Sequence, residues 1–85
     1  MHYVYVLQSQ LSKKIYTGNT DDLQRRLEEH NSGRNYSTKQ DKPYRLVYYE
    51  AYLSKLDALE RENRLKHHGS VIGHLKRRIR RSLNV

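Results

Sequence analysis

Four side chains near the beginning of the chain are of types that bind and cleave phosphate esters. Tyr5 and Tyr16 carry phenolic hydroxyls, Arg26 carries a guanidinium and His30 carries an imidazole. Arg26 and His30 are four residues apart, so on a helix they are neighbours on one face. A guanidinium binds phosphate through two parallel hydrogen bonds, and an imidazole or a phenolate accepts protons. Together these groups could hold and cut a phosphodiester.

Two short strands are predicted to carry the tyrosines. Residues 2–8 and 14–19 are rich in aromatic and β-branched side chains, which favours strands. Alternate side chains of a strand share a face, so Tyr16 and Gly18 lie on the same face of the second strand. The glycine indicates a close backbone approach or a sharp exit. A hairpin therefore brings Tyr5 near Tyr16.

A helix is predicted directly after this hairpin. It begins at Thr20 or Asp21, because Asp21 followed by Gln24 resembles a capping box. It ends at residues 31–33, where Asn-Ser-Gly is a good stop signal.

The second half of the chain is predicted to add one strand and two helices. Residues 34–43 are polar and form a loop, and residues 44–52 are a near-continuous apolar run typical of a central strand. A last helix begins at Ser70, because apolar residues recur there at helical spacing. These apolar residues are Val71, Ile72, Leu75, Ile79 and Leu83.

The helix after residue 52 places a carboxylate on its apolar face. Ser54 starts a capping-box pattern, and Ala58, Leu59 and Leu65 form the apolar stripe. Glu62 lies three residues from both leucines and therefore on the same face. A carboxylate that points inward needs a partner or a task.

The predicted order β-β-α-β-α-α describes an α+β fold, a small three-stranded antiparallel sheet flanked by helices. The 85 residues make a single domain, residues 1–85, with 70–85 as a basic C-terminal helix. Without cysteine, disulfides and thiolate metal sites are excluded. No apolar run approaches membrane-spanning length and no signal peptide is present, so we expect a cytoplasmic protein without membrane contact.

Positive charge is concentrated at the end of the chain. The net charge is +8, and the segment from Arg61 onward holds eight basic residues against one acid, which is +7 of it. Such a density of positive charge favours binding to a polyanion such as nucleic acid, because each neutralised phosphate releases counterions and adds affinity. The alternative is a solvated face that aids solubility. The residues expected to contact nucleic acid are Lys66, Lys76, Arg77, Arg80 and Arg81.

The chemistry-bearing residues resemble the motifs of the GIY-YIG nuclease superfamily. The first motif corresponds to residues 3–5 (YVY) and the second to 16–18 (YTG). An arginine belongs ten residues after the second motif's tyrosine, where Arg26 stands, and a histidine four further on, where His30 stands. Residues 58–62 (ALERE) match the pattern that ends in a metal-binding glutamate. The resemblance is closest to small stand-alone members and covers most of the chain.

Two motif positions depart from the family pattern, with Tyr3 in place of glycine and Thr17 in place of isoleucine. Many members also carry an asparagine near the end of the module. It has no counterpart here, because Asn63 is too early and Asn84 is nearly terminal.

The resemblance implies a role for each of the five residues. Glu62 binds a single divalent metal, Mg²⁺ or Mn²⁺, and Arg26 stabilises charge on the phosphate. Tyr5, with or without His30, takes the proton of the attacking water, and Tyr16 bonds the phosphate. His30 either shares this base role or bonds the oxygen of Tyr5. The phenol of Tyr5 is a poor base unless the metal and Arg26 lower its pKa.

Each role has a structural alternative. Glu62 could be the partner of Arg26 or Arg64 in a buried ion pair, and strand tyrosines usually pack in the core. His30 at a helix end could simply interact with the helix dipole. His67, His68 and His74 are read as phosphate contacts or solvent-facing groups, because adjacent histidines point apart on a helix.

We therefore expect a metal-dependent DNA endonuclease that hydrolyses phosphodiester bonds. The alternative is a non-catalytic module that binds DNA or RNA through the basic C-terminal face. The sequence leaves open whether the DNA is single-stranded, duplex or branched, and whether the protein is a monomer or a weak homodimer.

Overall fold

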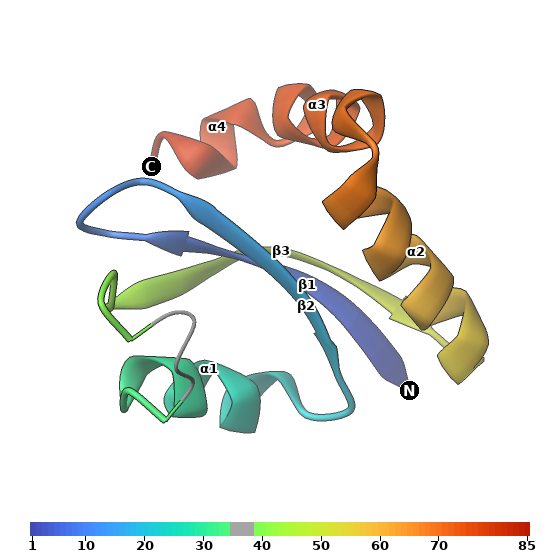
Figure 1. Ribbon diagram of the computed structural model, residues 1–85, viewed down its shortest axis with the longest axis horizontal. Coiled ribbons are helices and arrows are strands. Elements are labelled where there is room, and N and C mark those ends of the chain that lie inside the picture. Colours follow the sequence, from blue (N-terminus) through green and yellow to red (C-terminus); the bar gives the residue numbers. More distant parts are fainter. Residues whose placement is uncertain (35–38) are drawn as a thin grey trace.

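A computed structural model describes residues 1–34 and 39–85 and contains a three-stranded antiparallel sheet with helices on both faces (Figure 1). This arrangement confirms the predicted α+β class and the order of the main elements. The elements are β1 (His2–Ser9), β2 (Ile15–Thr20), α1 (Leu23–Asn31), β3 (Tyr44–Tyr52), α2 (Lys55–His67), α3 (Gly69–Arg78) and α4 (Arg80–Leu83).

The central strand is β1, since the sheet order is β2-β1-β3. The prediction that residues 44–52 form the central strand is therefore wrong. The tyrosines explain the error. Their rings make the segment look apolar, but their hydroxyls allow them to lie at an exposed edge of the sheet. Tyr49 on the edge strand β3 is 52% exposed and packs edge-on against Tyr3, with the ring centroids 5.8 Å apart.

The alternation of β1 divides the core into two clusters. Val4 and Val6 pack with Ala58, Leu65 and Leu75 on the side of α2 and α3. On the opposite face, Tyr5, Leu7 and Tyr44 pack with partly buried leucines of α1 and β3 and with Tyr16 of β2. The sheet therefore separates an aliphatic layer from a layer rich in tyrosine.

Helix α1 begins later than its sequence suggests. The N-cap is Asp22, whose Oδ1 accepts a hydrogen bond from the backbone N–H of Arg25 at 3.0 Å, so the capping box assigned to Asp21 and Gln24 is wrong. Asp21 pairs with the Arg25 side chain instead. The helix ends at Asn31 as predicted, and Gly33 takes a left-handed φ of +80° just beyond it.

Helix α2 begins as predicted, with the Ser54 side chain accepting from the Asp57 backbone N–H. Its buried side is narrower than expected. Ala58 and Leu65 are buried, whereas Leu59 is 37% exposed, which contradicts its placement on the apolar stripe. Residues seven apart return to the same side of a helix, and Leu59 is rotated about 100° from Ala58.

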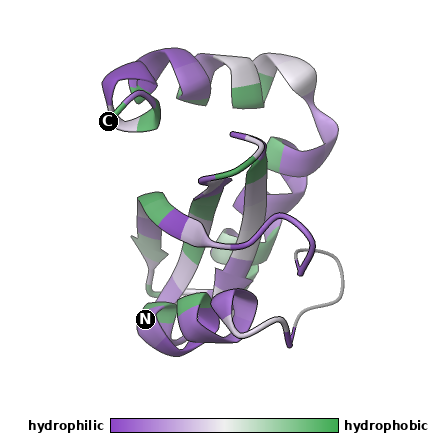
Figure 2. Cartoon of the chain, turned by 90° about the vertical axis from the view of Figure 1, so that its left-hand side faces the viewer, coloured by the Kyte–Doolittle hydropathy of each residue, from purple (hydrophilic) through white to green (hydrophobic). Residues whose placement is uncertain are grey.

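The basic C-terminal segment is two helices rather than one. Helix α3 ends at Arg78, Ile79 leaves helical geometry with φ −110° and ψ 22°, and α4 adds one short turn. Hydrophobic and hydrophilic residues alternate along this segment, as expected for a helix with one apolar side (Figure 2).

The predicted loop at residues 34–43 includes residues 35–38, which lie outside the described residues. Within the described part of the chain, every helix is too short or too polar to cross a membrane.

Candidate functional site

The side chains of Tyr5, His30 and Arg26 form one hydrogen-bonded chain on the α1 face of the sheet. The Tyr5 hydroxyl lies 3.0 Å from His30 Nε2, and Arg26 Nε donates to the same hydroxyl at 3.2 Å. Tyr5 and His30 are fully buried, whereas Arg26 reaches the surface and also pairs with Glu29 at 3.1 Å. The structure thus brings together the first tyrosine, the arginine and the histidine, as their spacing predicted.

Burial sets the protonation states of this chain. Burial lowers the pKa of His30 to about 4, and the nearby positive charge of Arg26 adds to the effect, so His30 is neutral at physiological pH. Burial also raises the pKa of the Tyr5 phenol, although the hydrogen bond from Arg26 opposes that rise. Tyr5 therefore keeps its proton. Arg26 lowers the pKa of Tyr5, as expected, but desolvation is the larger effect, so in the protein alone the pKa stays above its ordinary value.

These states assign the direction of each hydrogen bond. Arg26 donates to the Tyr5 oxygen, and in the neutral His30 tautomer that carries its proton on Nδ1 the Tyr5 hydroxyl donates its single proton to Nε2. A neutral imidazole is not the cation that a helix dipole attracts, so the dipole role considered for His30 does not apply at neutral pH. The hydrogen bond between His30 and the Tyr5 oxygen agrees with one of the two functional roles expected for this histidine.

Tyr16 lies beside this chain on the edge strand β2. Its ring packs against the His30 ring with centroids 5.0 Å apart, and Leu7 is its cross-strand partner. Tyr44 completes an aromatic surround for His30, at a centroid distance of 6.1 Å. Tyr16 is half-buried, with one side of its ring in the core. Its position is therefore compatible both with a packing role and with a functional role.

Gly18 allows the Tyr5 ring to reach past β2. The two residues are cross-strand partners, and a Cβ at position 18 would lie 2.4 Å from the Tyr5 hydroxyl oxygen. Any larger residue would therefore displace the phenol from Arg26 and His30. The close backbone approach predicted from this glycine is confirmed.

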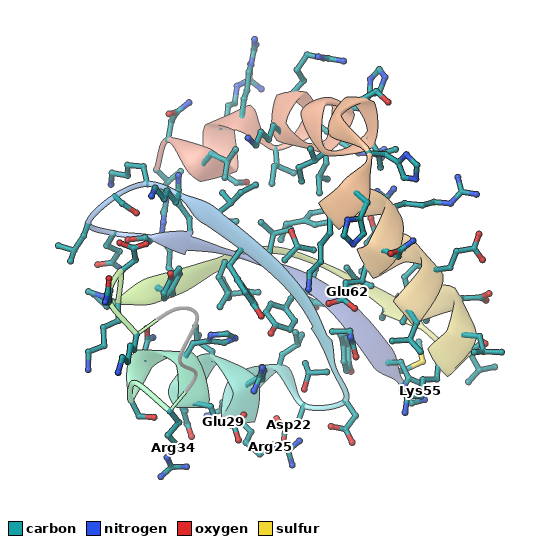
Figure 3. All side chains as sticks on the ribbon, in the orientation of Figure 1. Asp22, Arg25, Glu29, Arg34, Lys55 and Glu62 are labelled. Atoms are coloured by element: carbon teal, nitrogen blue, oxygen red, sulfur yellow. The ribbon has the colours of Figure 1, made fainter. Side chains whose placement is uncertain are left out.

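Glu62 lies on α2 and points toward the sheet (Figure 3), where two side chains contact its carboxylate. Lys66 Nζ is 2.9 Å from Oε2, and Asn19 of β2 donates through Nδ2 to Oε1 at 2.6 Å. The suggested partners Arg26 and Arg64 are not the ones found, because Arg26 pairs with Glu29 and Arg64 with Glu60. The Glu62 side chain is only 14% exposed.

Lys66 joins the Glu62 region to the tyrosine face. Its ammonium lies 5.6 Å from the centre of the Tyr16 ring while it pairs with Glu62. Tyr16 and Asn19 occupy opposite faces of β2, so Lys66 and Glu62 meet these residues around the free edge of that strand. Glu62 also raises the pKa of Tyr5 slightly through its charge, which places both groups in one electrostatic field.

The donor set at Glu62 fits a hard divalent cation. Among the residues that the structure describes, no group of three or more His, Cys, Asp or Glu side chains converges on one point. A single carboxylate beside an amide suits Mg²⁺, which retains most of its waters and takes one or two carboxylates. Glu62 would be the ligand, with the Asn19 amide next to it.

The predicted nucleic-acid contacts fall into two places. Lys66 is at the Glu62 site, whereas the other four lie on α3 and α4, on the opposite side of the sheet from α1 (Figure 1). Arg77 contacts His74 at 2.8 Å, and Arg80 and Arg81 line a surface hollow of about 260 Å³. The structure therefore does not bring these four residues to the Tyr5 chain. The four are Lys76, Arg77, Arg80 and Arg81.

The remaining histidines of the basic segment are exposed, as expected for His67, His68 and His74.

Asn19 is the site residue that sequence reasoning missed. It follows the second motif directly, and its place on the α2 side of β2 follows from alternation with Gly18. Its approach to Glu62, 43 residues later, depends on how α2 crosses the sheet. No signal in the strand singled it out, because Thr17 and Thr20 of β2 are also polar.

Known proteins resemble this chain over most of its length. A family model described as the GIY-YIG catalytic domain matches residues 1–71. A UPF0213 protein of Bacillus pumilus is 41% identical over 76% of this chain and 66% of its own length. UPF0213 proteins of Haloquadratum walsbyi and Staphylococcus aureus are 38% and 39% identical over 76% of this chain, and over 73% and 79% of their own lengths.

A solved structure is also similar. The solution NMR structure of a UPF0213 protein from Bacillus halodurans is 40% identical, covers 78% of this chain and 70% of that chain, and has a TM-score of 0.49. The matched region spans just under two thirds of the Bacillus pumilus protein.

Proposed function

Because the chain belongs to the family of the GIY-YIG catalytic domain, a nuclease superfamily, we propose that it is a metal-dependent endonuclease that hydrolyses DNA. The observation that carries this proposal is the hydrogen-bonded chain of Arg26, Tyr5 and His30 beside Glu62. A buried tyrosine hydroxyl needs one hydrogen-bond partner. The Tyr5 hydroxyl has two, the cationic Arg26 and the neutral base His30.

The chain of hydrogen bonds provides a path for the proton of an attacking water. As the Tyr5 oxygen receives that proton, its own proton moves to Nε2 of the neutral His30, so Tyr5 is never required to become a free phenolate. This path reconciles a phenol whose pKa is raised by burial with a role in proton transfer.

Arg26 is the group that stabilises the phosphate. Its Nε donates to Tyr5 while its Nη1 contacts the half-buried Glu29, so the guanidinium connects the buried hydroxyl to the surface. Exchange of Glu29 for a phosphate oxygen would leave the bond to Tyr5 intact. Tyr16 lies on the same face and would bond the phosphate through its hydroxyl.

Glu62 would bind the metal, which when bound supplies a positive charge that stabilises the leaving oxygen. The basic residues of α3 and α4, on the other side of the sheet, would contact DNA segments away from the reacting phosphate. Mn²⁺ would replace Mg²⁺ at this site, because both prefer oxygen ligands.

The test is cleavage of labelled single-stranded, duplex and branched DNA in Mg²⁺, Mn²⁺ or EDTA. We expect cutting only with metal, and a loss of roughly 100- to 1000-fold in the Arg26→Ala variant, as for removal of one charge-stabilising donor. Glu62→Ala should also abolish cutting while DNA binding persists.

Arg25→Ala is the matched control for Arg26→Ala. Arg25 is the adjacent arginine, lies on the outer side of α1 and pairs only with Asp21 among the contacts that the structure describes (Figure 3). It should retain wild-type cleavage. Equal losses in the two arginine variants would contradict the proposed role of Arg26.

A second candidate function follows from the separation of the basic helices from the Tyr5 chain. A module that only binds DNA or RNA through α3 and α4 would show steep salt dependence and no turnover. Absence of cleavage on every substrate, with binding intact in Glu62→Ala, would favour this function.

A further inference from the structure

Lys66 occupies the position that a divalent cation needs on Glu62. Its ammonium is 2.9 Å from Oε2, which is within the range of a charge-assisted hydrogen bond. The other carboxylate oxygen, Oε1, is taken by the Asn19 amide at 2.6 Å. Both oxygens of the carboxylate therefore have partners within the chain itself.

The two partners differ in how firmly they are placed. Asn19 projects from β2, with its backbone fixed by pairing with Val4 of the central strand. Lys66 has a flexible side chain that is 38% exposed, and its ammonium also lies over the Tyr16 ring. Lys66 can therefore leave Glu62 without disturbing the sheet, whereas Asn19 keeps the carboxylate oriented.

The geometry points to Lys66 as an internal counterion that a divalent metal must displace from Glu62, with the phosphate of the substrate as its next partner. This inference rests on the proposed function. Tyr16, which would bond that phosphate, already lies beneath the ammonium, so a short movement transfers Lys66 from carboxylate to phosphate. Asn19 is a positioning residue in the same exchange, since it holds Oε1 while Oε2 changes partner.

This exchange has a thermodynamic consequence. Metal on Glu62 releases Lys66 for the phosphate, and phosphate on Lys66 releases Glu62 for the metal. Each ligand therefore increases the affinity of the other, because coupling between two sites is reciprocal. The protein would bind metal weakly alone and more tightly with DNA in place.

The first experiment measures binding of Mn²⁺ alone, by the EPR signal of free Mn²⁺, without any nucleic acid. Lys66→Met removes the ammonium and keeps most of the aliphatic stem. We expect Mn²⁺ affinity to increase about tenfold, because a positive charge is removed within a few ångströms of the metal. Lys14→Met is the matched control, an exposed lysine in the β1–β2 connection that should bind Mn²⁺ like the wild type.

Two further variants locate the bound ion. Glu62→Gln should remove Mn²⁺ binding in both the wild-type and Lys66→Met backgrounds. Asn19→Ala should weaken it, because the carboxylate loses its fixed orientation. Unchanged or weaker Mn²⁺ binding in Lys66→Met, in a variant that melts like the wild type, would overturn the inference.

The second experiment measures the coupling. Binding of a labelled single-stranded oligodeoxynucleotide is followed by fluorescence anisotropy with and without Mn²⁺ at constant ionic strength, using the Arg26→Ala background to prevent cutting. We expect Mn²⁺ to tighten oligonucleotide binding about fivefold more when residue 66 is lysine than when it is methionine. Equal effects in the two proteins would overturn the coupling.

The two proposals fail separately. If Lys66→Met tightens Mn²⁺ binding but no DNA is cut, the counterion role stands and the endonuclease does not. If DNA is cut but the Lys66→Met affinity is unchanged, the endonuclease stands and the counterion role does not.

Discussion

Each face of the sheet carries a network of tyrosine and arginine, and the two networks differ in the group at their centre, a carboxylate in one and a phenol in the other. On the α2 face, Glu50 of β3 accepts hydrogen bonds from Tyr48 at 2.6 Å and from Tyr52. Arg61 of α2 donates to both carboxylate oxygens, at 3.0 and 3.2 Å from Nε and at 3.0 Å from Nη2. This network joins one negative and one positive charge.

The network on the α1 face has no carboxylate at its centre. Tyr5 lies between a neutral His30 and a positive Arg26, and Arg26 pairs with Glu29 near the surface. The buried part of this network is therefore neutral, and its single charge extends toward solvent. An anion can replace Glu29 there without leaving a buried charge unpaired.

The shifted pKa values reflect the same difference. Burial raises the pKa of Glu50, but the hydrogen bonds from Arg61 and the tyrosines outweigh it, so the carboxyl titrates below its ordinary value. Tyr52 donates to that carboxylate, and burial together with this bond raises its pKa to about 12. Both changes favour the state in which the Glu50 carboxyl is ionised and the Tyr52 hydroxyl is protonated. On the α1 face, by contrast, burial leaves a neutral base next to a protonated phenol. A network centred on a paired carboxylate stabilises the fold, whereas a neutral base next to a protonated phenol is available for proton transfer.

Breaking the Glu50 network on the α2 face should have the largest effect on stability. Glu50→Ala leaves Arg61 without its partner at a partly buried position, and we expect a loss of about 3 kcal/mol in the free energy of unfolding. Urea unfolding measures this loss. Cleavage per folded molecule should be unchanged, so a parallel loss of activity at temperatures where the variant is folded would contradict the separation of the two networks.

Tyr5→Phe removes the central hydroxyl of the other network and keeps the ring. We expect a loss of cleavage of about 100-fold, since proton transfer through a positioned side chain typically contributes that much. The cost in stability should be about 1 kcal/mol, because one hydrogen-bonded hydroxyl is removed.

Tyr48→Phe is the matched control on the α2 face, because its hydroxyl is also hydrogen-bonded. It should lose similar stability and no activity. If both variants lose cleavage equally, the tyrosine networks do not differ in function.

Mild acid should distinguish the two networks without any substitution, through the pH dependence of the free energy of unfolding. Between pH 6.5 and about 4 the unfolded chain protonates His30 while the folded protein keeps it neutral, because its pKa is lowered to about 4. The unfolded state then binds more protons, so the free energy of unfolding falls as the pH is lowered through this range. The His30 contribution is fully present above pH 6.5, and its loss by pH 4 should be about 3 kcal/mol.

An NMR titration of the His30 ring in the folded protein is the direct measurement for this prediction. Protonation with a midpoint near 6.5 would contradict the assignment of a neutral, buried imidazole. The Glu50 network should persist over the same range, because its carboxyl titrates below the ordinary value.

Much of the α1 face could be predicted from spacing alone. Tyr5 and Tyr16 are fixed to one face by strand alternation, and Arg26 and His30 to one side of a helix by the four-residue interval. Local geometry of this kind depends on residues close in sequence. The central strand was misassigned because a run of tyrosines does not distinguish an edge strand from a buried one.

Contacts between distant segments required the tertiary structure. Asn19 and Glu62 are 43 residues apart, and their meeting depends on the path of α2 across β2. The capping residue of α1 and the break at Ile79 were also not predicted from the sequence.

The sequence by itself determined the element order, the concentration of charge and the placement of Arg26 and His30 on one side of a helix, because periodicity and composition act locally. The tertiary structure decided which strand is central, which partners Glu62 has and how each group is protonated. Those properties depend on burial and on the approach of distant segments, which periodicity does not encode.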